Sequence, residues 1–76
     1  MTTEQWRETE QTIRNILGEL EGAACHRLRV VVMDGVAYVD GHVPEYRCKK
    51  GMTQLVARVA SSCRVVNRAR VLPSEP

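Results

Sequence analysis

The stretch that decides the fold runs from residue 28 to residue 43 and reads LRVVVMDGVAYVDGHV. Apolar residues alternate with other residues on both sides of a central pair, Asp34-Gly35. Such alternation is typical of a strand with one buried face, because successive side chains of a strand point to opposite sides of the sheet. An Asp-Gly pair tolerates positive φ at both positions, as a two-residue hairpin turn requires. The stretch therefore predicts an antiparallel hairpin with strands at residues 26–33 and 36–43.

A two-residue turn fixes which residues of the two strands lie opposite each other. On the face expected to be buried, the pairs are Val32 with Ala37, Val30 with Val39 and Leu28 with Gly41. On the outer face, the pairs are Met33 with Val36, Val31 with Tyr38, Arg29 with Asp40 and Arg27 with His42. The predicted Arg29–Asp40 pair brings opposite charges together across the strands. A shift of one residue would bury the arginines, so the chemistry of both faces favours this register.

Two amphipathic segments flank the hairpin, at residues 3–21 and 45–61, and each predicts a helix. Their apolar sides consist of Trp6, Thr9, Ile13, Ile16, Leu17 and Leu20 in the first helix and of Cys48, Met52, Leu55, Val56 and Val59 in the second. Residues 64–72 alternate again and predict a third strand, followed by a short tail at 73–76. The expected fold is α+β, an αββαβ two-layer sandwich in which both helices cover one face of a three-stranded sheet. We expect the second strand to be central and parallel to the third.

The composition limits what the chain can be. Its 76 residues include no Phe, one Trp and two Tyr, so we assign residues 1–76 to a single domain with a thin aliphatic core. No apolar run of about 18 residues predicts a membrane span, and the N-terminus lacks the basic start and apolar stretch of a signal peptide. The expected location is the cytoplasm if the chain is complete, and the periplasm or cell envelope if it was excised from a larger exported protein.

Candidate chemical groups are few. His26 and His42 approach each other in the predicted register, but with Cys25 and Cys48 they match no zinc-binding spacing. The third thiol, Cys63, makes the count odd, and we interpret all three as reduced, small apolar fillers. No catalytic triad motif and no Gly-rich phosphate loop is present. The sequence therefore predicts neither an enzyme, nor a metal site, nor a cofactor.

The order of the hairpin, a helical stretch and the run Val65-x-Asn67-x-Ala69-x-Val71 resembles the BON domain over residues 8–72. The positions that match the family's pattern are Asp34, Gly35, Gly41, Val65, Asn67 and Val71. BON domains are small modules of bacterial envelope and stress proteins, proposed to bind phospholipid or partner proteins, with no known catalytic residues. The resemblance implies a non-catalytic binding module. We interpret Asn67 as a side chain that bonds a neighbouring backbone group, with ligand contact as the alternative.

The outer face of the predicted sheet carries the candidate binding site. With both helices on the other face, it exposes apolar side chains among arginines, and the predicted partner- or lipid-binding residues are Arg29, Val31, Met33, Val36, Tyr38, Arg68 and Arg70. Such a patch suits a protein partner, a second copy of the chain, or the surface of an anionic phospholipid membrane. Single-stranded nucleic acid is the alternative ligand, although this face offers one aromatic ring, Tyr38, for base stacking. A solvated sheet face is a further interpretation, since some exposed apolar area is normal.

Overall fold

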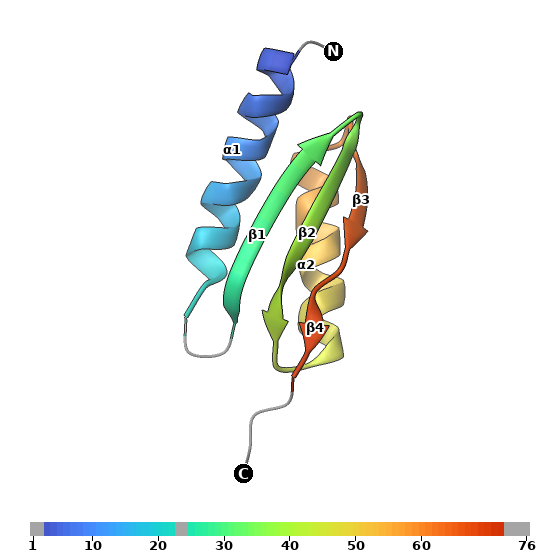
Figure 1. Cartoon of the computed structure of the whole chain (residues 1–76). Coiled ribbons are helices and arrows are strands. Elements are labelled where there is room, and N and C mark those ends of the chain that lie inside the picture. The colour runs from blue at the N-terminus through green and yellow to red at the C-terminus, as the bar shows by residue number, and fades with distance from the viewer. Residues whose placement is uncertain (1–2, 23–24, 73–76) are drawn as a thin grey trace.

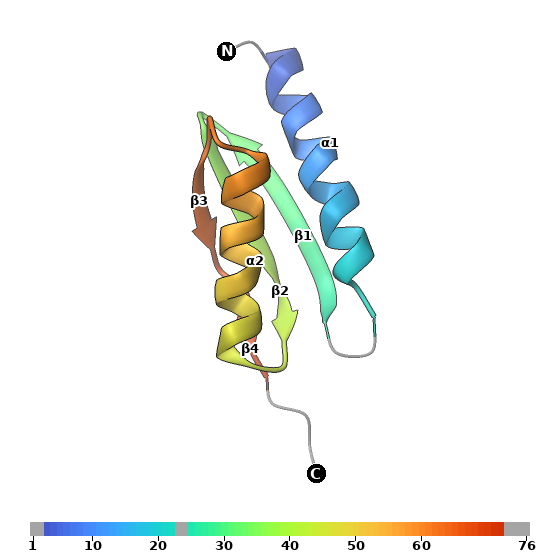
Figure 2. The ribbon, with the colours of Figure 1, turned by 180° about the vertical axis from the view of Figure 1, so that it is seen from behind.

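The computed structural model describes residues 3–22 and 25–72, so the predicted tail at 73–76 lies outside the described residues. The elements in chain order are α1 (Thr3–Leu20), β1 (His26–Met33), β2 (Val36–Val43), α2 (Tyr46–Val59), β3 (Arg64–Asn67) and β4 (Arg70–Val71). The predicted α+β class is confirmed. The two helices lie side by side against the same face of the sheet (Figure 1, Figure 2).

The sheet has four strands, so the prediction of three is wrong. β2 is central, antiparallel to β1 and parallel to both β3 and β4, as predicted for the second and third strands. The predicted third strand is divided between Asn67 and Arg70. There the side-chain Oδ1 of Asn67 accepts a hydrogen bond from the N–H of Ala69 at 2.9 Å. A side chain that bonds its own backbone two residues on competes with the regular strand, which explains the break.

The hairpin turn forms as the Asp-Gly pair predicts. Asp34 and Gly35 have φ values of 49° and 77°, the two positive values that a type I′ turn needs. Next to the turn, every pair from Met33–Val36 to Arg29–Asp40 has the predicted register.

Farther from the turn the predicted register is wrong. His26, and not Arg27, lies opposite His42, because β1 is irregular between His26 and Arg29. Arg27 has a φ of 55°, which is uncommon for a residue other than glycine. An extra residue in one strand is a β-bulge, and it removes Leu28 from its predicted place in the ladder opposite Gly41.

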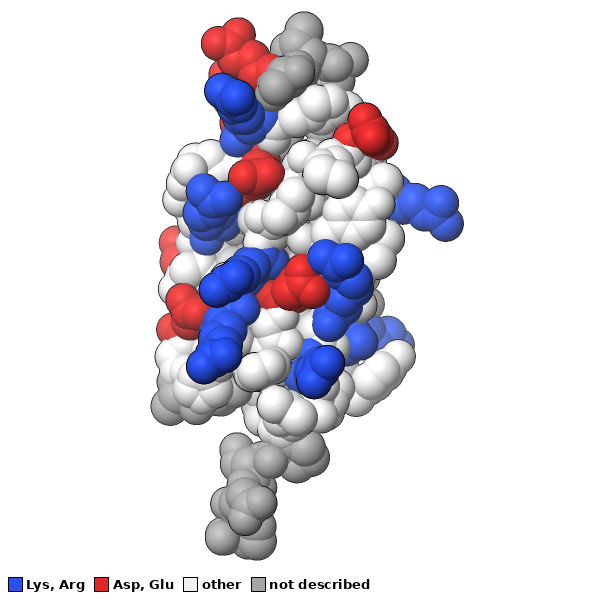
Figure 3. Space-filling view, in the orientation of Figure 1, with Lys and Arg blue, Asp and Glu red and all other residues white. Residues whose placement is uncertain are grey.

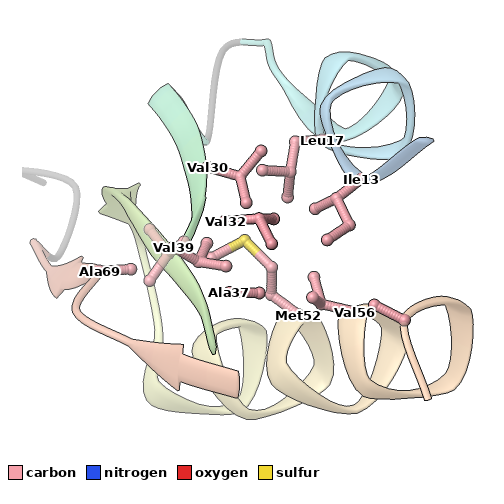
Figure 4. Packing of buried hydrophobic residues seen from close by; sticks show 11 residues of the cluster. Ile13, Leu17, Val30, Val32, Ala37, Val39, Met52, Val56 and Ala69 are labelled. Carbon is pink, nitrogen blue, oxygen red and sulfur yellow. The ribbon is translucent and has the colours of Figure 1, made fainter. Parts of the chain in front are cut away.

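The core lies between the sheet and the two helices (Figure 4). It contains the buried residues Ile13, Leu17, Val30, Val32, Ala37, Val39, Val43, Met52, Val56, Ala60 and Ala69. It is aliphatic, as the composition predicts. Leu20 and Val59 depart from their predicted place, because they are 42% and 38% exposed. Each is the last residue of its helix, one turn beyond the last buried side chain of that helix.

Asn67 joins β3 to α2 from the buried side of the sheet. Its Nδ2 donates hydrogen bonds to the backbone oxygen of Lys49 at 2.9 Å and to Oγ1 of Thr53 at 2.8 Å. Together with the bond to Ala69, these contacts use both donors and the acceptor of the amide. The interpretation of Asn67 as a structural side chain is therefore confirmed.

Replacing this amide is expected to destabilise the domain. Asn67→Ala removes three hydrogen bonds of a partly buried group, each contributing about 1 kcal/mol, so the free energy of unfolding should fall by about 2–3 kcal/mol in urea titration. Gln54→Ala, on the exposed side of α2, is the control and should change it by less than about 0.5 kcal/mol. Equal effects of the two variants would show that the amide contributes nothing specific.

Candidate interaction surface on the open face of the sheet

The open face is the side of the sheet turned away from the helices. It carries the alternate residues of each strand, because those between them point into the core. Val30 is 3% exposed, whereas its neighbour Val31 is 45% exposed and Met33 is 55% exposed. No helix in the described part of the chain covers this face, which Figure 3 shows from the front.

The strand pairing arranges the open face in rows that run across the sheet. From the hairpin turn downward, the rows are Met33, Val36 and Arg64; then Val31, Tyr38 and Val66; then Arg29 and Asp40; then His42 and Arg70. Arg68, two residues after Val66, contacts Asp40 and so joins the third row. The face thus has a mainly apolar half near the turn, with Arg64 at its β3 edge, and a basic half away from the turn. Basic side chains gather over that lower half around an acidic group (Figure 3).

A small cluster joins the two halves. Nη2 of Arg68 donates to Oδ2 of Asp40 at 2.8 Å, and its Cζ lies 5.0 Å from the centroid of the Tyr38 ring. The side chains of the ion pair are 54% and 43% exposed, so solvent screening limits its contribution to at most about 1 kcal/mol. The cation–π contact adds about 0.5–1 kcal/mol. The main effect of the cluster is to hold the Arg68 guanidinium over the Tyr38 ring, in the middle of the face.

The predicted charge pair between Arg29 and Asp40 is only partly correct. The two residues lie opposite each other, but the ion pair of Asp40 is with Arg68. The Tyr38 ring explains this preference, because it holds the Arg68 guanidinium beside the carboxylate. Among the described residues, Arg29 and Arg70 have no acidic partner, so their charges face solvent.

All seven predicted site residues lie on this one face. Four further residues of this face were not among the predicted site residues, namely Asp40, His42, Arg64 and Val66. The alternation of residues 64–72 was a usable signal for Arg64 and Val66, since it places them on the same side as Arg68. Asp40 could not be linked to Arg68 in this way, because the two residues are far apart in sequence.

The helix side of the molecule has an apolar pocket of about 280 Å³, lined by Leu20, Cys25, Val43, Cys48, Gly51, Met52 and Leu55. Cys25, Cys48 and Cys63 are free thiols, each half-buried. Burial raises the pKa of the Cys25 thiol above its ordinary value, and the charge of Cys48 raises it further. Cys25 is therefore a neutral thiol at pH 7 and suits the apolar lining. In residues 3–22 and 25–72, no three His, Cys, Asp or Glu side chains are grouped to hold a metal ion.

No family model matches this chain, and neither a curated protein nor a solved structure matches it. In the described part of the chain, neither helix has the length and apolar character needed to cross a bilayer. The open face, with its separate apolar and basic halves, is therefore the basis on which we assign a function.

Proposed function

We propose that this chain is a non-catalytic, BON-like interaction module that binds through the open face of its sheet. The observation that carries the proposal is the face that no described helix covers, on which Val31 and Met33 are exposed beside arginines that have no acidic partner among the described residues. Apolar contact supplies affinity without direction, whereas charge selects the partner and speeds its encounter. The ligand we infer has an apolar patch next to acidic groups.

Three ligands have this chemistry: an acidic partner protein, a second copy of the chain, and an anionic phospholipid surface. For lipid, each arginine near the headgroups adds about 1 kcal/mol of attraction, which salt screens. Three of the positions that carry the resemblance to the BON family have structural roles in this fold, which supports the proposal of a BON-like module. Asp34 and Gly35 form the turn, and Asn67 joins β3 to α2.

Single-stranded nucleic acid is the less favoured ligand. A sheet that binds bases does so by stacking them on exposed aromatic rings. Among the described residues, Tyr38 is the only aromatic residue on the open face, and the guanidinium of Arg68 already lies over its ring. A base would have to displace that contact before it could stack.

The test separates the ligands by variants on the two halves of the face. If lipid is the ligand, vesicles of phosphatidylserine and phosphatidylcholine should bind the domain, and added salt should weaken the binding, because the arginine charges are screened beyond about 8 Å at physiological ionic strength. Arg29→Ser with Arg70→Ser should weaken it several-fold without a lower melting temperature, because neither arginine forms an ion pair with a described residue. The control, Arg7→Ser with Arg58→Ser, removes equal charge from the exposed sides of α1 and α2 and should have little effect.

If a second copy is the ligand, light scattering should show a dimer that Tyr38→Glu converts to a monomer. If an acidic protein is the ligand, that protein should shift the NMR resonances of Val31 and Met33. A domain that stays monomeric at millimolar concentration, ignores acidic vesicles and shows no open-face shifts with acidic proteins would overturn the proposal.

A further inference from the structure

The two edges of the sheet differ in how their backbone groups are satisfied. β1 forms one edge, and α1 lies beside it (Figure 1, Figure 2). On this edge the N–H of Val32 donates to a carboxylate oxygen of Glu10 at 2.9 Å, and the N–H of Leu28 donates to Glu21 at 3.3 Å. An exposed edge strand is a template for pairing with another chain. Side chains of α1 and the segment after it therefore occupy two of the donors of this edge.

β3 forms the other edge, and part of its backbone faces outward. The N–H of Arg64 donates to the backbone oxygen of Gly35, in the turn before β2, at 2.8 Å, and that of Arg68 donates to the backbone oxygen of Val39 in β2 at 2.7 Å. Backbone groups along a strand point to its two sides in alternation. The N–H and C=O groups of Val65 and Asn67 therefore point away from β2, to the free side of the sheet. The edge ends at Ala69, whose N–H is bonded to the Asn67 side chain.

A hollow of about 450 Å³ lies at this same edge, on the helix side. It is lined by Tyr46, Lys49, Lys50, Thr53, Gln54 and Asn67, which come from α2 and from the end of β3. The Asn67 amide is drawn toward α2 by its bonds to Lys49 and Thr53. An edge strand beside a helix-lined hollow has the arrangement in which an extended peptide adds to a sheet and places alternate side chains in the hollow.

Basic residues stand on both sides of this edge. Arg64 and Arg68 flank Val66 on the open face, and Lys49 and Lys50 line the hollow. Antiparallel pairing of two copies centred on Val66 would set Arg64 of one copy opposite Arg68 of the other, and like charges directly opposite destabilise a sheet. The charges therefore disfavour a second copy and favour an acidic strand.

We propose that the free edge of β3 binds an extended acidic segment of a partner protein by strand addition. Acidic side chains of the added segment lie beside Arg64 and Arg68, and an apolar side chain lies beside Val66. The backbone groups of Val65 and Asn67 form the new ladder. This binding uses the backbone edge of β3 and is distinct from the open-face function, although Arg64, Val66 and Arg68 also belong to the open face.

The probe is a blocked peptide in which a central valine lies between two glutamates. Threonine occupies the positions between these three residues and outside them. Isothermal calorimetry should show saturable binding that weakens as salt is added. Arg64→Glu should weaken binding at least about tenfold, whereas Arg7→Glu, the same charge change on exposed α1, should not. Replacing both peptide glutamates with lysine should abolish binding to the natural chain and restore it in part to Arg64→Glu.

Backbone methylation of the peptide tests the ladder itself. Methylating the amides at one alternate set of positions should abolish binding, because those amides face β3, while methylating the other set should leave it unchanged. The set that matters reports the direction of the added strand. Equal binding of both methylated peptides would overturn strand addition, since side-chain contacts alone would then explain the affinity.

Amide exchange locates the site on the domain. The peptide should slow hydrogen exchange at Val65 and Asn67 and leave the amide of Val66, which faces β2, unchanged. Val31→Ser, which changes the open face on β1 at the opposite edge of the sheet, should still bind the peptide, and this separates the β3 edge from the open-face function. Slower exchange on β1 instead of β3, or no binding at millimolar peptide, would overturn the proposal. The arginines would then be charges that prevent the β3 edge from pairing with other chains in aggregates.

Discussion

Val39→Asp is expected to leave the domain unfolded in the absence of denaturant. Val39 lies in the central strand and is 1% exposed, with the core of both helices on its side of the sheet (Figure 4). A buried carboxylate without a partner costs several kcal/mol. A domain of this size has a total stability at the low end of about 5–15 kcal/mol. Circular dichroism and the dispersion of the NMR spectrum measure the loss of the fold.

Val31→Asp is the matched control, because it puts the same group on the neighbouring strand but on the open face. Val31 is 45% exposed, so the new carboxylate remains hydrated, and the free energy of unfolding should fall by less than about 1 kcal/mol. A similar loss of stability in the two variants would contradict the assignment of buried and open faces.

Gly41→Ala is expected to lower the free energy of unfolding by about 2–4 kcal/mol, from backbone strain together with overpacking. Gly41 has a φ of 153°, which residues with a Cβ rarely adopt. A Cβ there would lie 2.6 Å from Cδ2 of Leu28 and 3.1 Å from its Cα. The Leu28 side chain can move, but its backbone can move only if the bulge in β1 shifts. Urea denaturation measures the loss.

Gly18→Ala is the control for this variant and should act in the opposite direction. Gly18 lies inside α1, and no atom lies within 4 Å of the Cβ that alanine would add. Replacing a helical glycine with alanine should therefore stabilise the domain by about 0.5–1 kcal/mol. A Gly41→Ala variant as stable as the natural chain would show that the bulge relaxes freely and that its geometry does not constrain the fold.

The local part of the fold could be read from the sequence. Asp34-Gly35 specifies a turn with two positive φ values, and the turn then fixes the pairing of the residues next to it. The alternation of apolar residues fixes which side of each strand is buried, because a shift of one residue would exchange the two faces. These features depend on neighbours within a few residues. For the same reason the sequence placed all seven predicted site residues on one face.

Only the tertiary structure decided the features that depend on distant residues. The bulge at Arg27 replaces the predicted pairing with His42, and Gly41 across from it accepts the close approach of Leu28. The division of the third strand follows from the Asn67 amide, which bonds both α2 and Ala69. Each of these features depends on a contact whose strength could not be predicted from the local sequence pattern.

The candidate sites show the same division. The sequence by itself determined that one face of the sheet would be apolar and basic, because side-chain alternation is a property of each strand alone. It did not determine that Asp40 pairs with Arg68, that side chains of α1 and the segment after it bond the edge of β1, or that no described strand pairs with the outer side of β3. Those outcomes were decided when the strands paired and the helices packed against the sheet, since only this assembly fixes which groups of distant residues come into contact.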